Sequence, residues 1–491
     1  MRGQYLRAVA MTASLLLAGC MVGPDYKRPA TALPATFVEA NVPGASGAVP
    51  EQWWKLYNDP VLDALVADGL AYNTEVQAAA ARVEEAEAQL REAHAVLYFP
   101  TINGNAGVNR GRSFQLGVPA TGTLYSIGIS TAFEVDIWGR LRRGERSVRD
   151  NLLASRYGRD TVALTLVAII TRTYFTALSL DSQYKASEES RAAAEDSLAL
   201  ARRRLEGGVA SALDVYQAGT VATGAAAQSK EIARQRAAVV HALGVLTGRL
   251  DVTVPSRDVS DLPVPPLPPA GLPSELLERR PDVRQSEEEL ASATELIGVA
   301  RGSQFPTLTL TGSLGAQNPE LSNLFESGSH VWGLGAGLLG PILDGGRYAA
   351  RTDQAVARAK QAEASYRGTV QNAFRDVSDA LSNLRYAKDT EADLVEHLQQ
   401  SREALRLSRI RYERGYSPFL EVLDATRTLN DAQLLFIRNR QNYLSYTVDL
   451  MNSLGGGWKS TADESGAESG NGVRADAAAP LNAGEQKAYS R

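Results

Sequence analysis

The chain has 491 residues, a length that suits two or three domains or one elongated repeat protein. Hydrophobic residues make up 44% of it, aromatic residues 7% and charged residues 22%, which excludes a fully disordered chain and a polytopic helical membrane protein. The net charge of −5 argues against a nucleic-acid-binding protein, so no nucleic-acid partner is expected. A single cysteine and four histidines far apart in the sequence leave no metal-ligand spacing, and no metal site is expected.

The first 19 residues are predicted to be a signal peptide. Arg2 and Arg7 flank a short apolar stretch that ends Leu17-Ala18-Gly19-Cys20, and small residues before a cysteine resemble a bacterial lipobox. The pattern therefore predicts a covalent lipid on Cys20. The alternative is an ordinary signal peptide with a cysteine nearby by chance, but the chain's only cysteine stands at the one position a lipobox requires. After Cys20 no uninterrupted apolar run of about 18 residues follows, so no transmembrane helix is expected.

The two halves of the chain resemble each other at a spacing of about 207 residues. Motifs recur in order over more than 150 residues, which shared helical composition would not produce, and the period is too long for a solenoid. The matched pairs are Phe99-Pro100 with Phe305-Pro306, Leu205-Glu206-Gly207-Gly208 with Tyr412-Glu413-Arg414-Gly415, Leu213-Asp214-Val215 with Leu420-Glu421-Val422, and Leu246-Thr247-Gly248 with Ser453-Leu454-Gly455.

Each half is predicted to contain a helix that ends near a proline, two strands, and two long helices joined by a glycine-bearing turn. The fold class is mainly α with β, in an internally duplicated chain. The expected segments are a lipidated N-terminal and first helical part (20–98), a first strand hairpin (99–140), a first helical hairpin (141–250), a proline-rich linker (251–273), a second-repeat helix (274–304), a second strand hairpin (305–346), a second helical hairpin (347–458) and a disordered tail (459–491).

The strands alternate apolar with polar or small residues, as in Ile127 to Ile137 and Thr307 to Leu314. This alternation suits both an outer-membrane barrel and a half-buried soluble sheet. The exported, lipidated context and the isolation of the strands between helices favour the barrel. Four strands cannot close a barrel, since about eight is the smallest number that does. Three copies would supply twelve strands, while two or four copies remain geometrically possible.

The long helices carry no proline and have approximate heptads near their distal ends. In the long helix of the first half, Leu198 and Leu205 are seven residues apart, and Ala194 and Ala201 alternate with them along the same seam. In the long helix of the second half, Leu398 and Leu405 have the same spacing. This spacing predicts left-handed supercoiling of paired helices. The small seam residues and polar second faces favour a hollow helical wall over a solid bundle.

Four sequence motifs together resemble those of the TolC/OprM-type outer membrane efflux lipoproteins (NodT-like subfamily), and the resemblance covers residues 15–458. They are Cys20-Met21-Val22-Gly23-Pro24-Asp25-Tyr26, Trp53-Trp54, Arg279-Arg280-Pro281-Asp282-Val283-Arg284 and Leu454-Gly455-Gly456-Gly457-Trp458. The resemblance implies a homotrimer with a twelve-stranded barrel in the outer membrane, continued by a long α-helical coiled-coil barrel in the periplasm. It implies a periplasmic membrane-fusion adaptor and an inner-membrane transporter of the resistance-nodulation-division type as partners. Met21, in place of an aspartate, agrees with an outer-membrane location for the lipid anchor.

The resemblance also implies that the helix-pair turns form the periplasmic tip, where the duct closes and the adaptor docks. The turns are Gly207-Gly208-Val209 and Gly415-Tyr416, although ordinary glycine helix ends explain the glycines equally well. Leu420 and Asp424 match the leucine and aspartate of the family's constriction and share a helix face, with Glu421 beside Asp424. Further candidates for locking contacts are Asp214 and Tyr412. Ser417 and Pro418 supply no basic residue where some relatives carry an arginine tether.

The expected function is therefore a passive efflux channel that exports drugs or other small toxic compounds, and not an enzyme. Gly335-Ala336-Gly337-Leu338-Leu339-Gly340 fits a dinucleotide-binding pattern, but it lies inside an alternating strand and no cofactor is expected beyond the lipid on Cys20. The alternative function is a lipid-anchored periplasmic coiled-coil scaffold or adaptor without a pore.

Overall fold

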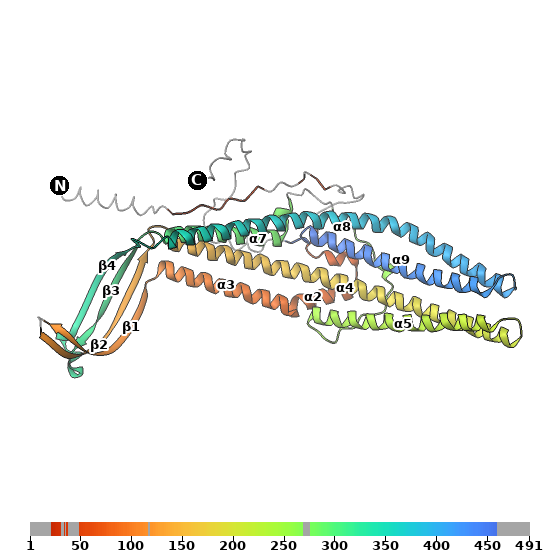
Figure 1. Cartoon of the computed structure of the whole chain (residues 1–491), viewed down its shortest axis with the longest axis horizontal. Coiled ribbons are helices and arrows are strands. Elements are labelled where there is room, and N and C mark those ends of the chain that lie inside the picture. The colour runs from red at the N-terminus through yellow and green to blue at the C-terminus, as the bar shows by residue number, and fades with distance from the viewer. Residues whose placement is uncertain are drawn as a thin grey trace. The chain divides into compact units, whose positions relative to one another are not determined.

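The two repeats fold into the same series of elements, as Figure 1 shows. The first repeat contains α2 (Pro60–Tyr72), α3 (Thr74–Tyr98), β1 (Thr101–Gln115), β2 (Val118–Val135), α4 (Arg140–Glu206) and α5 (Ala212–Thr247). The second contains α6 (Leu276–Arg279), α7 (Pro281–Gly302), β3 (Thr307–Asn318), β4 (His330–Leu339), α8 (Arg347–Glu413) and α9 (Phe419–Ser453). Among the described residues this is a mainly helical chain with four strands, as the sequence predicts.

The computed structural model describes residues 21–30, 34, 36, 37, 49–115, 118–268 and 275–458. All of them belong to one unit, Met1–Trp458, and a second unit, Lys459–Arg491, lies outside the described part. The predicted signal peptide, the lipidation site at Cys20 and the predicted tail therefore fall outside the described residues.

Three pairs of glycines give the two repeats the same helix ends. Gly139 and Gly346 precede α4 and α8, with φ of 77° and 83°. Two further pairs, Gly208 with Gly415 and Gly248 with Gly455, follow the long helices and also have positive φ. Only glycine takes this left-handed conformation without strain, and each pair is 207 residues apart. The duplication seen in the sequence is thus a duplication of backbone turns.

The four strands form one antiparallel sheet in the order β1-β2-β3-β4. β2 and β3 pair from Tyr125↔Asn318 to Val135↔Leu308 and so join the two repeats. The β1–β2 hairpin continues past the end of β3, up to the pair Gln115↔Val118. Because β1 and β4 have a neighbour on one side only, the sheet has two open edges.

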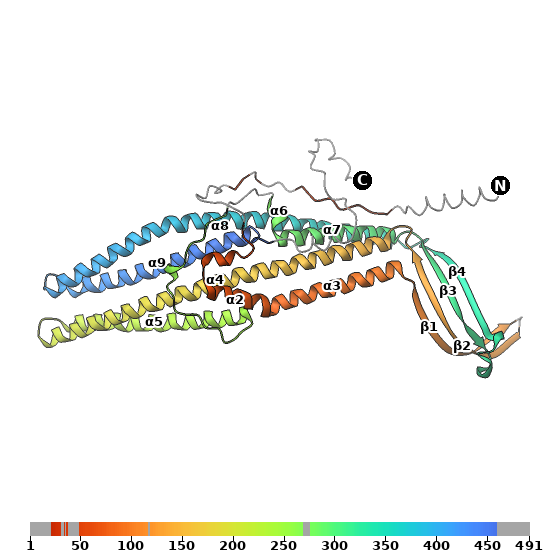
Figure 2. The ribbon, with the colours of Figure 1, turned by 180° about the vertical axis from the view of Figure 1, so that it is seen from behind.

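The helices next to the sheet repeat the strand order. α3 packs against α4, α4 against α7, and α7 against α8, so α3 and α8 lie at the two open sides (Figures 1 and 2). α4 and α8 each have 67 residues. At 1.5 Å per residue, each is a rod of roughly 100 Å. α5 folds back along the distal half of α4, and α9 folds back along the distal half of α8, so that two helical hairpins form.

The main apolar core lies where α2, α4, α5 and α9 meet. Trp53, Tyr57 and Phe175 are fully buried there, and the Tyr57 ring packs edge-on against Phe175 at 4.9 Å. The Tyr57 hydroxyl shares a 2.5 Å hydrogen bond with the Thr447 hydroxyl of α9. Burial raises the pKa of this phenol. The short helix Trp53–Tyr57 thus ties the N-terminal part of the chain to the last helix through Tyr57.

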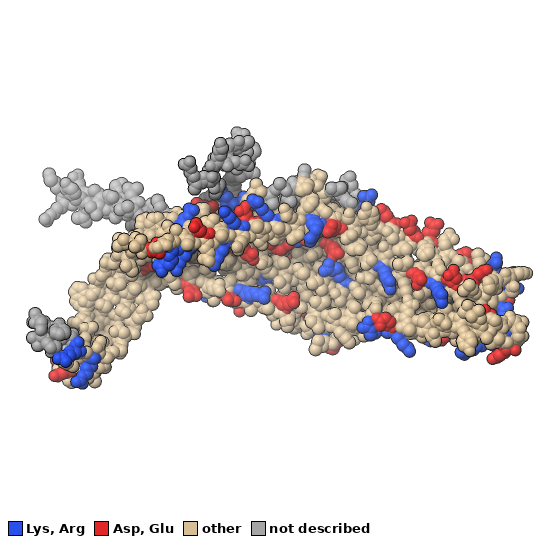
Figure 3. Space-filling model, viewed as in Figure 1, with Lys and Arg blue, Asp and Glu red and all other residues tan. Residues whose placement is uncertain are grey.

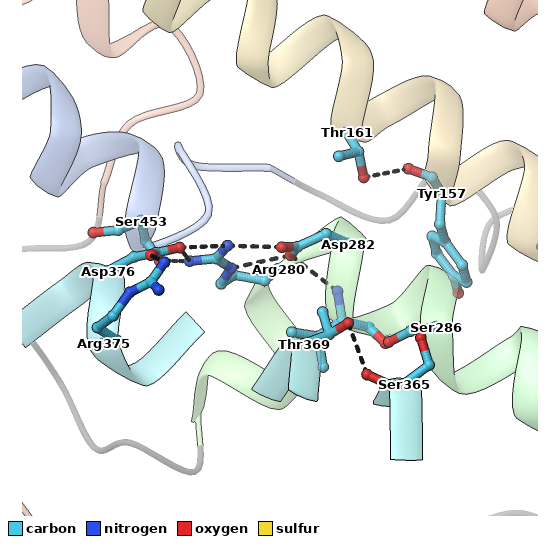
Figure 4. A network of polar contacts seen from close by, with 11 residues as sticks. Tyr157, Thr161, Arg280, Asp282, Ser286, Ser365, Thr369, Arg375, Asp376 and Ser453 are labelled. Carbon is cyan, nitrogen blue, oxygen red and sulfur yellow. Dashed lines mark hydrogen bonds and ion pairs between the residues drawn. The ribbon is translucent and has the colours of Figure 1, made fainter. Parts of the chain in front are cut away.

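The Arg280–Asp282 motif fastens the beginning of α7 to the middle of α8 and to the end of α9 (Figure 4). Arg280 donates to Asp282 at 2.7 Å, to Asp376 of α8 at 3.3 Å, and to the Ser453 carbonyl of α9 at 3.2 Å. Pro281 occupies the first helical position, where its missing N–H leaves no bond unmade. The conformation that lets α7 begin here also places Arg280 among three helices.

The heptad seams appear in the structure with one difference between the hairpins. In α8, Leu384, Leu398 and Leu405 are buried, and the charged seam residue Glu391 pairs with Arg440 of α9 at 3.2 Å. In α4 the small residues are buried instead, whereas Leu205 is 38% exposed. Arg191 forms ion pairs with Glu188 and Glu195 along its own helix. The leucine at the end of the first seam is consequently less buried than the leucines of the second seam.

One described helix is long and apolar enough to cross a membrane by length and composition. It is α4, which contains an 18-residue window of mean hydropathy 1.5. Threonines and Arg172 interrupt this stretch, so it is not one of the uninterrupted apolar runs that the sequence analysis looked for. Half of the window is buried, and its residues Ile170 and Leu178 lie in the main core. Core helices pass the same test, so this is weak evidence for a helical span.

Candidate functional site

The two hairpin turns have the same backbone geometry at the end of the unit opposite the sheet. After α4, Gly208 has φ 75° and the Val209 N–H donates to the Arg204 carbonyl at 2.9 Å. After α8, Gly415 has φ 76° and the Tyr416 N–H donates to the Arg411 carbonyl at 2.8 Å. Both are helix ends of the Schellman type. Gly207 has φ −77°, an ordinary helical value, so its being glycine is not required by the turn.

The outermost side chains of both turns are apolar and exposed. Val209 is 70% exposed and Tyr416 is 76% exposed. Two large apolar side chains at the tips of neighbouring hairpins are suited to contact with another protein. The five predicted docking residues, Gly207, Gly208, Val209, Gly415 and Tyr416, thus lie at the two tips, where Val209 and Tyr416 are the exposed apolar side chains.

Tyr412 connects the two hairpins. Its side chain is 7% exposed and packs on Phe419 at a ring distance of 5.0 Å. Arg204 of α4 lies over the ring at 4.4 Å and donates to the Tyr412 carbonyl at 3.0 Å. Burial raises the pKa of the Tyr412 phenol; Arg204 opposes this rise and Asp214 adds to it. The structure therefore adds Arg204 to the candidates, a residue that the sequence analysis missed.

The two repeat-related acids, Asp214 and Glu421, have different surroundings. The Asp214 carboxylate accepts from the Ser211 N–H at 2.9 Å while the Ser211 hydroxyl accepts from the Asp214 N–H at 3.2 Å. This is a capping box that starts α5. Glu421 begins a helix without a side-chain cap and lies 3.6 Å from the Arg411 guanidinium. Both partners of that ion pair are exposed, so it contributes little to stability.

Leu420 and Asp424 lie on the outer face of α9. Leu420 is 59% exposed and Asp424 is exposed, while Val422 and Leu423 between them are buried. Within the described part of the chain, no hydrogen bond or ion pair is recorded for the Asp424 carboxylate. The two side chains therefore share a face that one copy of the chain leaves uncovered, as the helical spacing predicts.

The sheet at the other end has one apolar and one polar face. Residues paired across the four strands share a face, and Ile129, Leu314 and Trp332 form one such row. Beyond the row of Thr131, Gly312 and Leu334, two further rows on this face contain Phe133, Leu310 and Ala336, and Val135, Leu308 and Leu338. The opposite face carries Asn103, Ser130, Ser313 and Gly333, and then Thr101, Ala132, Thr311 and Gly335. The surface of the strands is correspondingly free of charge over most of its length in Figure 3.

Aromatic residues mark the boundary between strands and helices. Trp138 stacks on Phe305 at 4.6 Å and donates from its indole N–H to the Pro306 carbonyl at 2.8 Å. The N-terminal segment reaches the same place, since the Val22 N–H donates to the Trp138 carbonyl at 3.1 Å. An apolar strand face bordered by aromatic side chains is the arrangement of an outer-membrane barrel wall. No group of His, Cys, Asp and Glu that could hold a metal occurs among the described residues.

Comparison with known proteins now decides the family. The sequence model of the outer membrane efflux protein family matches residues 65–249 and 272–456, two segments that begin 207 residues apart. The chain belongs to this family. The segments correspond to the two repeats, and the chain is an outer membrane efflux channel and not an enzyme.

Relatives of similar length share this assignment. The toluene efflux pump outer membrane protein TtgC of Pseudomonas putida is 33% identical, over 92% of this chain and 96% of the relative. The pyoverdine export outer membrane protein OpmQ of Pseudomonas aeruginosa is also 33% identical, over 92% and 96%. Among solved structures, the outer-membrane channel OprN superposes with a TM-score of 0.84 at 30% identity, covering 89% of this chain and all of OprN. The open-state MtrE channel of Neisseria gonorrhoeae gives 0.79 at 28% identity.

These similarities confirm the predicted family, fold class and channel function. They give no support to the alternative of a scaffold without a pore. They leave the individual gate, docking and lipidation residues as predictions, because neither a shared family nor a shared fold tests a single side chain.

Proposed function

We propose that three copies of this chain form a closed outer-membrane exit duct that extends into the periplasm as the last component of a tripartite efflux pump. The two open edges support this. In each copy β1 and α3 lie at one side and β4 and α8 at the other, so a head-to-tail ring pairs unlike edges. Four strands do not close a barrel, and three copies supply twelve strands around an aqueous lumen.

In this ring the polar, small-residue face of the sheet lines the lumen and the apolar face contacts lipid. A covalent lipid on Cys20 anchors the same ring, because the N-terminal segment that follows it is bound at the strand–helix boundary through Val22. The anchor and the strands then enter the membrane at the same level, in the outer membrane of the cell.

The gate lies at the helical tips. The observation that carries this proposal is the uncovered face of Leu420 and Asp424, one turn inside the exposed turn at Tyr416. Repeated around the axis, Leu420 forms an apolar ring and Asp424 a carboxylate ring, with Glu421 beside it. Carboxylates held close together repel one another and attract cations, so the closed tip passes small cations only. The contact of Arg204 with Tyr412 holds neighbouring hairpins in the closed arrangement.

The exposed turns Gly207–Val209 and Gly415–Tyr416 bind a periplasmic membrane-fusion adaptor, which connects the duct to an inner-membrane transporter of the resistance-nodulation-division type. The adaptor opens the tip by separating the hairpins. The relatives are named for the export of toluene, antibiotics and pyoverdine. By analogy, this duct passes small organic compounds, including solvents and antibiotics.

Single-channel conductance in planar bilayers tests the gate. The wild-type protein is expected to give small, cation-preferring currents, and the Leu420→Ala/Asp424→Ala variant currents several times larger. The matched control is Leu213→Ala/Gln217→Ala, at the repeat-related positions of α5, which leaves the current unchanged. Absence of current from a folded, oligomeric wild-type protein would overturn the duct, whereas equal currents from all three proteins would overturn only this gate.

A further inference from the structure

β1 carries two arginines on the apolar face of the sheet. Arg110 and Arg112 are separated by one residue and so share a face, and they stand in phase with Ile102 and Val108 of the same strand. Ile102 is 67% exposed and Val108 is 65% exposed, as expected for a lipid-facing row. Both arginines are exposed. Within the described residues, no hydrogen bond or ion pair is recorded for either guanidinium.

Their level in the sheet follows from the strand register. β3 ends at Asn318, opposite Tyr125, and Tyr125 in turn faces Val108. Arg110 faces Thr123 and Arg112 faces Thr121, so both lie just beyond the four-stranded part. Arg110 is nine residues after the first residue of β1, and with about 3.3 Å per residue and a strand tilt of about 40° this gives a height of roughly 23 Å. That height matches the apolar band of a barrel, about 25 Å.

The sequence of residues along this face is that of an interface between hydrocarbon and headgroups. An apolar row is followed by an aromatic residue, Tyr125, and then by Arg110 and Arg112. Aromatic side chains concentrate at the edges of the hydrocarbon layer, and long cationic side chains reach from there to lipid phosphates. In Figure 3 basic side chains follow the uncharged surface of the strands at its far end.

No acidic residue of the strands neutralises the pair. The only acidic residue of β1 and β2 is Glu134, which lies at the opposite end of the sheet and binds Arg140 at 2.7 Å. The connection between β3 and β4 carries Glu320 and Glu326 at the same end as the arginines. Glu320 accepts from the Asn323 amide at 3.1 Å, and no ion pair joins either acid to Arg110 or Arg112.

We propose that Arg110 and Arg112 bind the phosphate groups of lipopolysaccharide in the outer leaflet of the membrane. This inference rests on the proposed barrel, which places the strand ends opposite the helices at the outer face. A guanidinium can donate two parallel hydrogen bonds to one phosphate, and two guanidinium groups on one face match a glycolipid that carries more than one phosphate. Three copies present six arginines around the barrel.

The position on the apolar face decides between lipid and solute as the partner. Arginines on the polar face would lie in the lumen and act on the passing ions or compounds. Arg110 and Arg112 instead continue the lipid-facing row, so the groups they meet belong to lipids. Phosphatidylglycerol also carries a phosphate, but it belongs chiefly to the inner leaflet, which borders the opposite end of the strands.

The test measures lipid binding by the full-length, purified protein in detergent. The probes are lipopolysaccharide, the same lipopolysaccharide with its phosphates removed, and phosphatidylglycerol. The variant is Arg110→Gln/Arg112→Gln, and the matched control is Arg202→Gln/Arg402→Gln, which removes two exposed helical arginines instead. At about fivefold per arginine near a charged lipid surface, the two arginines should make the wild-type protein and the control prefer phosphorylated lipopolysaccharide by about thirtyfold.

The proposal predicts that the variant loses this preference while Arg110→Lys/Arg112→Lys keeps most of it. A preference that persists in the glutamine variant, or a wild-type protein indifferent to phosphate, would overturn the proposal. Equal binding of phosphatidylglycerol and lipopolysaccharide would overturn the assignment to this glycolipid. Conductance of the same variants separates this result from the proposed function: the glutamine variant should conduct like the wild type, and a protein that never conducts fails as a duct whatever lipid it binds.

Discussion

The two hairpin tips share a backbone but use their side chains differently. At the first tip, Ser211 and Asp214 form a capping box, so the acid is engaged within its own helix. At the second tip, α9 begins at Phe419, the preceding Pro418 supplies no side-chain cap, and the acids Glu421 and Asp424 are exposed. Duplication thus produced two equal turns, of which one is self-contained and the other presents an uncovered charged and apolar face.

This difference shows how one fold unit acquires two roles. The first tip supplies Arg204, which reaches over to the Tyr412 ring of the second. The second tip receives that contact and presents Leu420 and Asp424 outward. The first hairpin therefore holds the second hairpin, which carries the proposed gate. Substitutions and a change of pH test this difference between the hairpins, and they are given from the largest expected effect to the smallest.

Tyr412→Ala is expected to have the largest effect on the tips. Removing a buried aromatic side chain lowers stability by about 3 kcal/mol or more, and here the substitution also removes the surface on which Arg204 rests. Amide hydrogen exchange should become faster in the distal parts of both α4 and α8, since the contact joins them. The matched control is Tyr216→Ala in α5, a tyrosine that is 76% exposed and should leave exchange nearly unchanged.

An effect confined to α8 and α9 would contradict this, because it would mean that Tyr412 stabilises only its own hairpin. Tyr412→Phe keeps the ring and the backbone carbonyl that Arg204 binds, and should therefore behave almost like the wild type.

The sequence was sufficient for the parts of this comparison that depend on local patterns. The glycine turns, the shared face of Leu420 and Asp424 and the alternation of the strands all follow from residue spacing. The Arg204–Tyr412 contact joins residues 208 positions apart, and no local pattern reports such packing. The capping box could have been predicted, since Ser211 and Asp214 have the spacing of this motif, but the sequence analysis interpreted Asp214 only as a locking residue. Gly207 was grouped with Gly208 because spacing alone does not give φ.

Substitution of the turn glycines tests which of them are required by the backbone conformation of the turn. Gly208→Ala and Gly415→Ala should each lower hairpin stability by about 1–2 kcal/mol, because alanine at positive φ is strained. The space around both positions is open, so no steric clash adds to this cost. Gly207→Ala should be neutral or slightly stabilising, since Gly207 is helical. Chemical denaturation followed by amide hydrogen exchange at the tips measures the hairpin stability of all three variants. Equal losses of stability in the three would show that the turn geometry is not the cause.

The smallest expected effect is a pH dependence of the contact between Glu188 and Ser229 in the first hairpin. Glu188 of α4 accepts hydrogen bonds from Arg191 and from the Ser229 hydroxyl of α5, and these lower its pKa from the ordinary 4.5. A lowered pKa means that the contribution is fully present above the ordinary value and is lost as the pH falls below it through the folded-state pKa.

In the second hairpin Glu403, whose pKa is lowered by Arg406, bonds along α8 only, whereas a different acid, Glu391, joins α8 to α9 through Arg440. Exchange protection factors, which correct for the intrinsic rates, should fall around Ser229 as the pH drops below 4.5, because protonation of Glu188 weakens its hydrogen bond to the Ser229 hydroxyl. Glu188→Gln should remove this fall around Ser229. If both hairpins loosen together in the wild type and in the variant, the acid sensitivity belongs to some other group, and the link between α4 and α5 through Glu188 does not contribute.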